Sequence, residues 1–156
     1  MQGLWWWQQP EIRDRHRDID ERQTALEKIK RLFDSMIKKE FHNNQQNLLI
    51  ALNIQDNITL RNKMKMAAIE TVAPVLAELL DQGIAEGTIK TDMPEESAEM
   101  IVATISFLFD TSVFPERDQK LHNKLRLLAR VLETCLRAEP GSFDFLFSRR
   151  DNYTNN

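Results

Sequence analysis

Glycine and proline are scarce in this sequence, which has four glycines and five prolines among 156 residues. Average usage would supply about 19 of the two together in a chain of this length. Because sandwiches and barrels need turn residues every few positions, the shortage disfavours them and predicts long helices. The hydrophobic share of 42% and the charged share of 29% are typical of one folded domain with a core and exclude bulk disorder.

Several other features are missing as well. A single cysteine, Cys135, excludes an internal disulfide framework and a cysteine-based zinc site, and it fits a reducing compartment. The net charge of −3 gives no general attraction to phosphate, which argues against the wrapping of nucleic acid. The longest mostly apolar run, 100–109, has about half the length of a membrane span, and the N-terminus lacks a secretory pattern. We therefore expect a soluble, intracellular, helical domain.

Catalytic and metal-binding motifs are also absent. The three histidines, His16, His42 and His122, are far apart, and none has the spacing of a helix-borne metal site. The sequence contains no glycine-rich phosphate loop and no Gly-x-Ser-x-Gly motif. These absences predict a protein that is not an enzyme and needs no cofactor.

Boundary signals first mark a helix after residue 23. Residues 1–23 form a leader that supplies at most one helix and carries the triple tryptophan 5–7. Thr24 and Glu27 have the spacing of a capping box, in which each side chain accepts from the other residue's backbone N–H. Apolar residues then recur in steps of three and four, which predicts an amphipathic helix to about residue 41, ended by the polar run 42–44.

Further helices follow this one. A short helix is expected over 44–53 and a long one from about 58 to 85, with Pro74 inside it and Gly87 as its left-handed C-terminal cap. Asp92 is the expected N-cap of a helix that continues to about residue 113 and is apolar around most of its circumference. Such a helix must be covered on most sides.

The last expected helix, about 116–138, has a heptad pattern. Its apolar residues alternate in steps of four and three, which suits a partner helix. We call the first four of them the leucine seam: Leu121, Leu125, Leu128 and Leu132. Cys135 continues the pattern and is expected to be a small buried side chain. The apolar segment 142–147 is expected to dock on its own domain or on a dimer mate.

Methionine and aromatic side chains are spread over several of these helices. Such side chains deform and stack, so together they suit a cavity for a greasy molecule, although any one of them can equally be core. A hydrophobic or planar cationic ligand is the expected occupant. The pocket and its chemistry therefore rest on the group of residues and on no single one.

The stretch from Thr24 to Ala138 resembles the C-terminal regulatory domain of tetracycline-repressor (TetR/AcrR) family transcription regulators. The phrase Val72-Ala-Pro-Val-Leu-Ala-Glu-Leu-Leu-Asp-Gln-Gly-Ile-Ala-Glu-Gly-Thr-Ile-Lys90 and the following Asp92-Met-Pro-Glu-Glu-Ser-Ala-Glu-Met-Ile101 carry the likeness. In that family a long helix ends in a motif with two glycines of this kind. An apolar helix with an acidic residue at its N-cap then follows. The opening from Thr24 is also typical of the helix that follows the family's domain linker.

The resemblance implies an all-α bundle of about six helices, whose last two pair with those of a second copy in a four-helix bundle. It divides the chain into the leader 1–23, a regulatory domain 24–140 and a tail 141–156. The expected effector-binding residues are Phe33, Met36, Phe41, Leu49, Met64, Ala68, Val72 and Phe107. The expected dimer-interface residues are Ala103, Phe107, Leu121, Leu125, Leu128 and Leu132.

The resemblance also implies a function. It indicates the effector-binding and dimerisation domain of a bacterial, cytoplasmic repressor that a small hydrophobic ligand releases from DNA. The family's DNA-reading helix-turn-helix domain has no counterpart before Thr24, so DNA binding is expected only of an intact protein. An alternative is a helical module without a DNA-reading domain, which acts by heterodimerisation and has no ligand pocket. Neither hypothesis involves a membrane.

Overall fold

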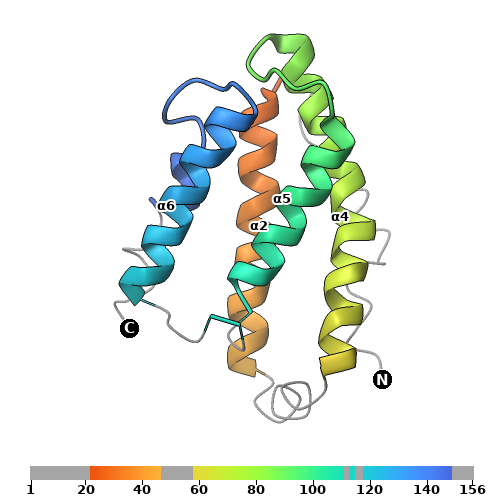
Figure 1. Ribbon diagram of the computed structural model, residues 1–156, viewed down its shortest axis with the longest axis vertical. Coiled ribbons are helices and arrows are strands. Elements are labelled where there is room, and N and C mark those ends of the chain that lie inside the picture. The colour runs from red at the N-terminus through yellow and green to blue at the C-terminus, as the bar shows by residue number, and fades with distance from the viewer. Residues whose placement is uncertain (1–21, 47–57, 111–112, 115–117, 149–156) are drawn as a thin grey trace.

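Figure 1 shows the computed structural model, which describes residues 22–46, 58–110, 113–114 and 118–148. These residues form the helices α2 (Ala25–Gln46), α4 (Ile58–Glu86), α5 (Pro94–Leu108) and α6 (Asp118–Cys135) and the short 3-10 helix η1 (Asp144–Leu146), with no strand among them. The expected all-α fold is confirmed. The expected helix in the leader and most of the one over 44–53 lie outside the described residues.

The four helices run alternately down and up the bundle (Figure 1). α2 and α5 run downward in this view, α4 and α6 run upward, and α5 lies between α6 and α4. α5 packs closely against α4, and α2 packs against α4 as well. This order brings the two helices expected to form a dimer face next to each other.

One hydrophobic core joins all four helices. Each helix contributes a stripe of buried residues at steps of three and four, as an amphipathic helix must. The main members are Ile29, Leu32 and Phe33 of α2, Ala73, Leu76 and Leu80 of α4, Ile101, Val102 and Ile105 of α5, and Leu128, Ala129 and Leu132 of α6.

The start of α2 is fixed twice. The capping box is confirmed, because the Glu27 backbone N–H donates to Thr24 Oγ1 at 3.3 Å and the Thr24 N–H donates to Glu27 Oε2 at 2.9 Å. In addition, the Ala25 N–H donates to the carboxylate of Glu86, in the last turn of α4, at 3.0 Å. A negative group there offsets the positive end of the α2 dipole, so α4 holds the N-terminus of α2 in place.

The polar run 42–44 does not end α2, which continues to Gln46. That expectation was wrong because histidine and asparagine weaken a helix by only about 0.7 kcal/mol each and do not block it as proline does. α4 likewise runs through Pro74. Pro74 and Glu70 are both exposed, so the Glu70 carbonyl that loses its helical donor can be hydrated.

Gly87 ends α4 in the left-handed conformation, as predicted, with φ of 76°. The N–H groups of Thr88 and Ile89 then donate to the Gly83 carbonyl at 3.0 and 3.1 Å, which closes the last turn. Ile89 folds back into the core over Gly83, where a Cβ would lie 2.7 Å from Ile89 Cδ1. The two glycines therefore allow the chain to turn directly from α4 towards α5.

α5 is shorter than expected at both ends. Its N-cap is Met93 and not Asp92, because Pro94 takes the first helical position and sets the boundary one residue later. The Thr91 hydroxyl accepts from the Met93 N–H at 3.2 Å in place of the expected acidic cap. At the other end α5 stops at Leu108, well before residue 113, where Asp110 turns towards α4 and pairs with Lys65.

The segment after α6 folds back onto the domain. We call residues 139–148, which include η1, the C-terminal strap; it contacts both α6 and α2. Phe143 and Leu146 of the strap are buried in the common core. Of the two expected positions for this apolar segment, the structure shows docking on its own domain.

Glu133 of α6 clamps the strap. Its buried carboxylate accepts from the backbone N–H of Gly141 at 2.8 Å and of Phe143 at 3.4 Å. Arg130 donates to the same carboxylate at 2.7 and 2.9 Å and pairs with Asp144 of η1 at 3.0 Å. One side chain of α6 therefore satisfies two backbone donors in the turn that starts the strap.

The surroundings of Glu133 lower its pKa. Burial acts in the opposite direction and would raise the pKa, but the hydrogen bonds from Arg130, Phe143 and Gly141 together outweigh it. The folded state thus favours the ionised carboxylate, and the clamp is formed by its charged form.

A change at Gly87 tests the C-terminal cap of α4. We expect Gly87→Ala to lower the free energy of unfolding by about 1 kcal/mol, because its Cβ meets no neighbour and only the left-handed backbone is penalised. Gly87→Asn should lose less, since asparagine tolerates this conformation. Urea unfolding of both variants measures the difference, and equal losses would contradict this explanation.

The pH dependence of Glu133→Gln tests the clamp. Since the folded-state pKa is lowered, the stabilisation is complete above the ordinary glutamate value of about 4.3 and is lost as the pH falls through the folded-state value. The variant should therefore be less stable than the wild type by about 1.5 kcal/mol at neutral pH, the low end for charged hydrogen bonds because Arg130 is half exposed. The gap should shrink in acid.

Urea unfolding at neutral and acidic pH measures this gap. Glu139→Gln, the same change at an exposed side chain of the strap, serves as the control and should lie near the wild type throughout. A gap for Glu133→Gln that stays constant from neutral to acidic pH would show that ionisation plays no part.

Candidate functional site

The expected effector-binding residues are divided between the core and its margin. Phe33 is fully buried, and Met36 and Val72 are partly buried against the same core cluster. Met64 and Ala68 of α4 are half-buried. The structure thus brings Phe33, Met36 and Val72 into one cluster, with the other two further along α4.

The remaining expected effector-binding residues are not in this cluster. Phe107 lies on an outer side of α5 with 45% of its surface exposed. The side chain of Phe41 and the whole of Leu49 lie outside the described residues. Two open depressions lie at α6, one around Arg130 and Gly141 and the other around Asn123 and Leu127, and neither is lined by a described member of the expected pocket.

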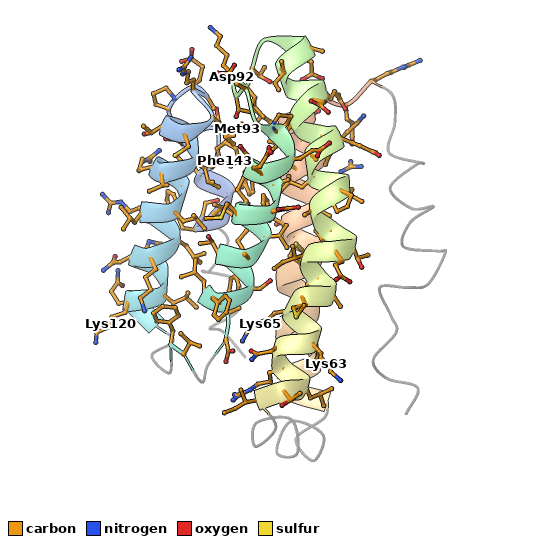
Figure 2. The ribbon with its side chains drawn as sticks, turned by 45° about the vertical axis from the view of Figure 1, so that its right-hand side comes forward. Lys63, Lys65, Asp92, Met93, Lys120 and Phe143 are labelled. Carbon is orange, nitrogen blue, oxygen red and sulfur yellow. The ribbon has the colours of Figure 1, made fainter. Side chains whose placement is uncertain are left out.

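A charged cluster at the lower end of α5 was not foreseen. The Asp110 carboxylate, which is mostly buried, pairs with Lys65 and has Arg61 Nη1 at 4.0 Å. Lys65 also lies over the ring of Phe107, 4.5 Å from its centroid, and Figure 2 shows it beside the end of α5. The cluster ties the N-terminal half of α4 to the C-terminal end of α5, close to Met64 and Ala68 in the sequence.

The leucine seam of α6 faces inward. Leu121, Leu125, Leu128 and Leu132 are all buried within the single subunit. The next member of the buried stripe is Leu136, and Cys135 is exposed. The expectation for Cys135 was wrong because the stripe continues by a step of four after Leu132, as a helix of 3.6 residues per turn allows.

The outer sides of α5 and α6 carry a second set of apolar residues. Met100 and Phe107 of α5 are 68% and 45% exposed, and Leu127 and Val131 of α6 are 65% and 45% exposed. Half-buried Ala103 lies between the two α5 residues. We call these five residues the outer stripes. A stripe of large exposed apolar side chains along a helix is a feature of interaction sites.

Charge differs between the two outer stripes. Exposed glutamates flank the stripe of α5 at Glu95, Glu96 and Glu99, and exposed arginines flank that of α6 at Arg126 and Arg130. A helix with an acidic margin and a helix with a basic margin are complementary if two copies cross so that α5 of one meets α6 of the other.

The described residues offer neither a metal-binding cluster nor a membrane-spanning helix. Within these ranges, no three histidine, cysteine, aspartate or glutamate side chains lie close enough together to hold a metal ion. No described helix combines the length and the apolar character that crossing a bilayer requires.

Comparison with known proteins identifies the family. The profile of the family described as "Tetracyclin repressor-like, C-terminal domain" matches residues 38–130, from the second half of α2 to Arg130 in α6. No curated protein matches the chain. The matched family is one of regulators with ligand-binding and dimerisation domains, and it is not a family of enzymes. Since the match covers more than half of the sequence, this chain belongs to the tetracyclin repressor-like C-terminal domain family.

Proposed function

We propose that this chain is the effector-binding and dimerisation domain of a TetR-type regulator, a cytoplasmic homodimer whose intact form a small hydrophobic ligand releases from DNA. The outer stripes are the single observation that carries the dimer. The core of the subunit is complete without them, yet large apolar side chains stay exposed on the two helices in question.

The proposed interface differs in its residues from the one expected from the sequence. Ala103 and Phe107 are kept, whereas the four leucines of the seam already pack inside the subunit. Met100, Leu127 and Val131 take their place as contacts to the second copy. A four-helix bundle of two α5–α6 pairs would use both sides of α6, the seam inward and the outer stripe outward.

The free energy of burying the outer stripes can be compared with the cost of association. Full burial of one such side chain contributes about 1.5–3 kcal/mol. A two-fold pair would bury eight large side chains that are 45–68% exposed in the single subunit. The free energy gained by their burial is comparable with the cost of association of about 4–15 kcal/mol. The complementary margins of glutamate and arginine then set the crossing of the helices and favour a stable pair.

The effector site is proposed between α2 and the first half of α4, with α5 beside it. Phe33, Met36 and Val72 already share one cluster, and Met64 and Ala68 are half-buried one to two turns earlier in α4. Flexible methionine side chains at a core margin suit ligands of varied shape. Phe41 and Leu49 remain predicted members of the site.

A second candidate function is an interaction module that acts by heterodimerisation and binds no ligand. The packing of Phe33, Met36 and Val72 within the core favours this candidate. It shares the outer stripes with the first proposal and differs from it in its partner and in the pocket.

Substitution in the outer stripe tests the dimer. Leu127→Asp should convert the dimer to a monomer with an unchanged helical circular dichroism spectrum, because it buries an unpaired charge only in the pair. Sedimentation at micromolar concentration measures the mass. Met66→Asp, at an exposed methionine of α4, is the matched control and should remain dimeric.

Leu125→Asp distinguishes the two sides of α6. Because Leu125 is buried inside the subunit, this variant should lose the fold itself and not merely the partner. A monomeric wild type under the same conditions would overturn the dimer, and a folded, monomeric Leu125→Asp would return the interface to the leucine seam.

Substitution at Met64 tests the effector site. Native mass spectrometry with a panel of hydrophobic and planar cationic compounds should show binding to the wild type. Met64→Trp should abolish it by filling the space, at a cost in stability of about 1–3 kcal/mol or less because Met64 is only half-buried. Met66→Trp, on the exposed side of the same helix, should bind normally. No binding by the wild type would support the interaction module instead.

A further inference from the structure

The C-terminal strap connects two helices that have little direct contact with each other. η1 contacts both α6 and α2, whereas α2 and α6 make few backbone contacts of their own. Two residues with positive φ direct the chain into the strap. Arg137 and Gly141 adopt φ of 47° and 90°, which turn the chain back after α6. It is therefore a defined part of the domain and not a loose end.

At its α2 side the strap ends in aromatic contacts. Phe145 stacks on Phe33 of α2 with ring centroids 6.0 Å apart, and Phe143 lies 5.8 Å from Phe145. Phe33 and Phe143 are each 1% exposed. Because protein interiors are close-packed, a displacement of the Phe33 ring presses on its stacked neighbour Phe145.

At its α6 side the strap ends in the Glu133 clamp. The Phe143 N–H donates to Glu133, and Glu133 accepts from Arg130 one turn earlier. Arg130 stands next to Val131 of the outer stripe and lines the same surface depression as Leu127. A continuous chain of contacts thus runs from Phe33, through Phe145, Phe143 and Glu133, to Arg130 at the proposed dimer face.

We propose that the C-terminal strap couples the effector end of α2 to the dimer face of α6. This inference rests on the proposed function, because Phe33 belongs to the proposed effector site and Arg130 borders the proposed interface. A ligand that moves the Phe33 ring shifts the aromatic contacts of the strap, and the clamp transfers the shift to the turn of α6 that carries Arg130. Both ends are specific contacts, so the strap biases how the two subunits meet.

A double-mutant cycle on the full chain tests the coupling without a ligand. Sedimentation equilibrium gives the dimer dissociation constant for the wild type, Phe33→Leu, Phe145→Leu and the double variant. Neither residue belongs to the outer stripes. Each single change should shift the constant by about fivefold or more, and the double variant should shift it no further than one single change.

A control separates coupling from simple loss of stability. Leu80→Val removes volume from the same core at α4 without interrupting the contacts from Phe33 to Arg130, and it should leave the dissociation constant unchanged. Single changes with no effect on the constant, effects that multiply in the double variant, or an equal effect of Leu80→Val would each overturn the coupling.

Hydrogen exchange tests the strap within one subunit. Glu133→Gln should speed the exchange of amides around Phe33 in α2 by about tenfold, the equivalent of one lost charge-assisted hydrogen bond, whereas Glu139→Gln should not. Unchanged exchange in α2 would overturn the link while leaving dimerisation intact. A monomeric wild type would instead overturn the proposed function, and the dimer end of the coupling with it.

Discussion

The burial of the leucine seam inside its own subunit is the constraint on which the rest of the structure depends. Because Leu121, Leu125, Leu128 and Leu132 complete the core, α6 is held in the bundle without a partner. Its other side, with Leu127 and Val131, stays exposed. A heptad pattern alone does not distinguish a stripe that packs inside its own subunit from one that packs on a partner helix, because both have apolar residues at the same spacing.

Features that depend on neighbouring residues were predictable from the sequence. The capping box of Thr24 and Glu27 and the left-handed Gly87 need only local backbone geometry, and both are confirmed. The expected Asp92 cap was wrong for a local reason too. Proline is favoured at the first helical position, so Pro94 occupies it and Met93 becomes the N-cap. The apolar steps of three and four predicted the all-α fold class, which is confirmed, whereas the described residues contain four α-helices and about six were expected for the chain.

Features that depend on distant residues were not predictable. Asp110 reads as a solvated acid after an apolar helix, and only the folded chain brings Lys65 of α4 to it. Glu133 similarly reads as an exposed glutamate on a charged helix, although it is the acceptor for two N–H groups of the strap.

The position of the strap has a consequence for biosynthesis. Phe143 and Leu146 are core residues, yet they are made after all four described helices. Since domains begin to fold while the ribosome is still working, the helices can assemble early, but they lack two interior side chains until the last part of the domain emerges. A product that ended just after α6 would expose Phe33 and the neighbouring core surface. Cellular proteases would then degrade it before it could pair with a complete subunit.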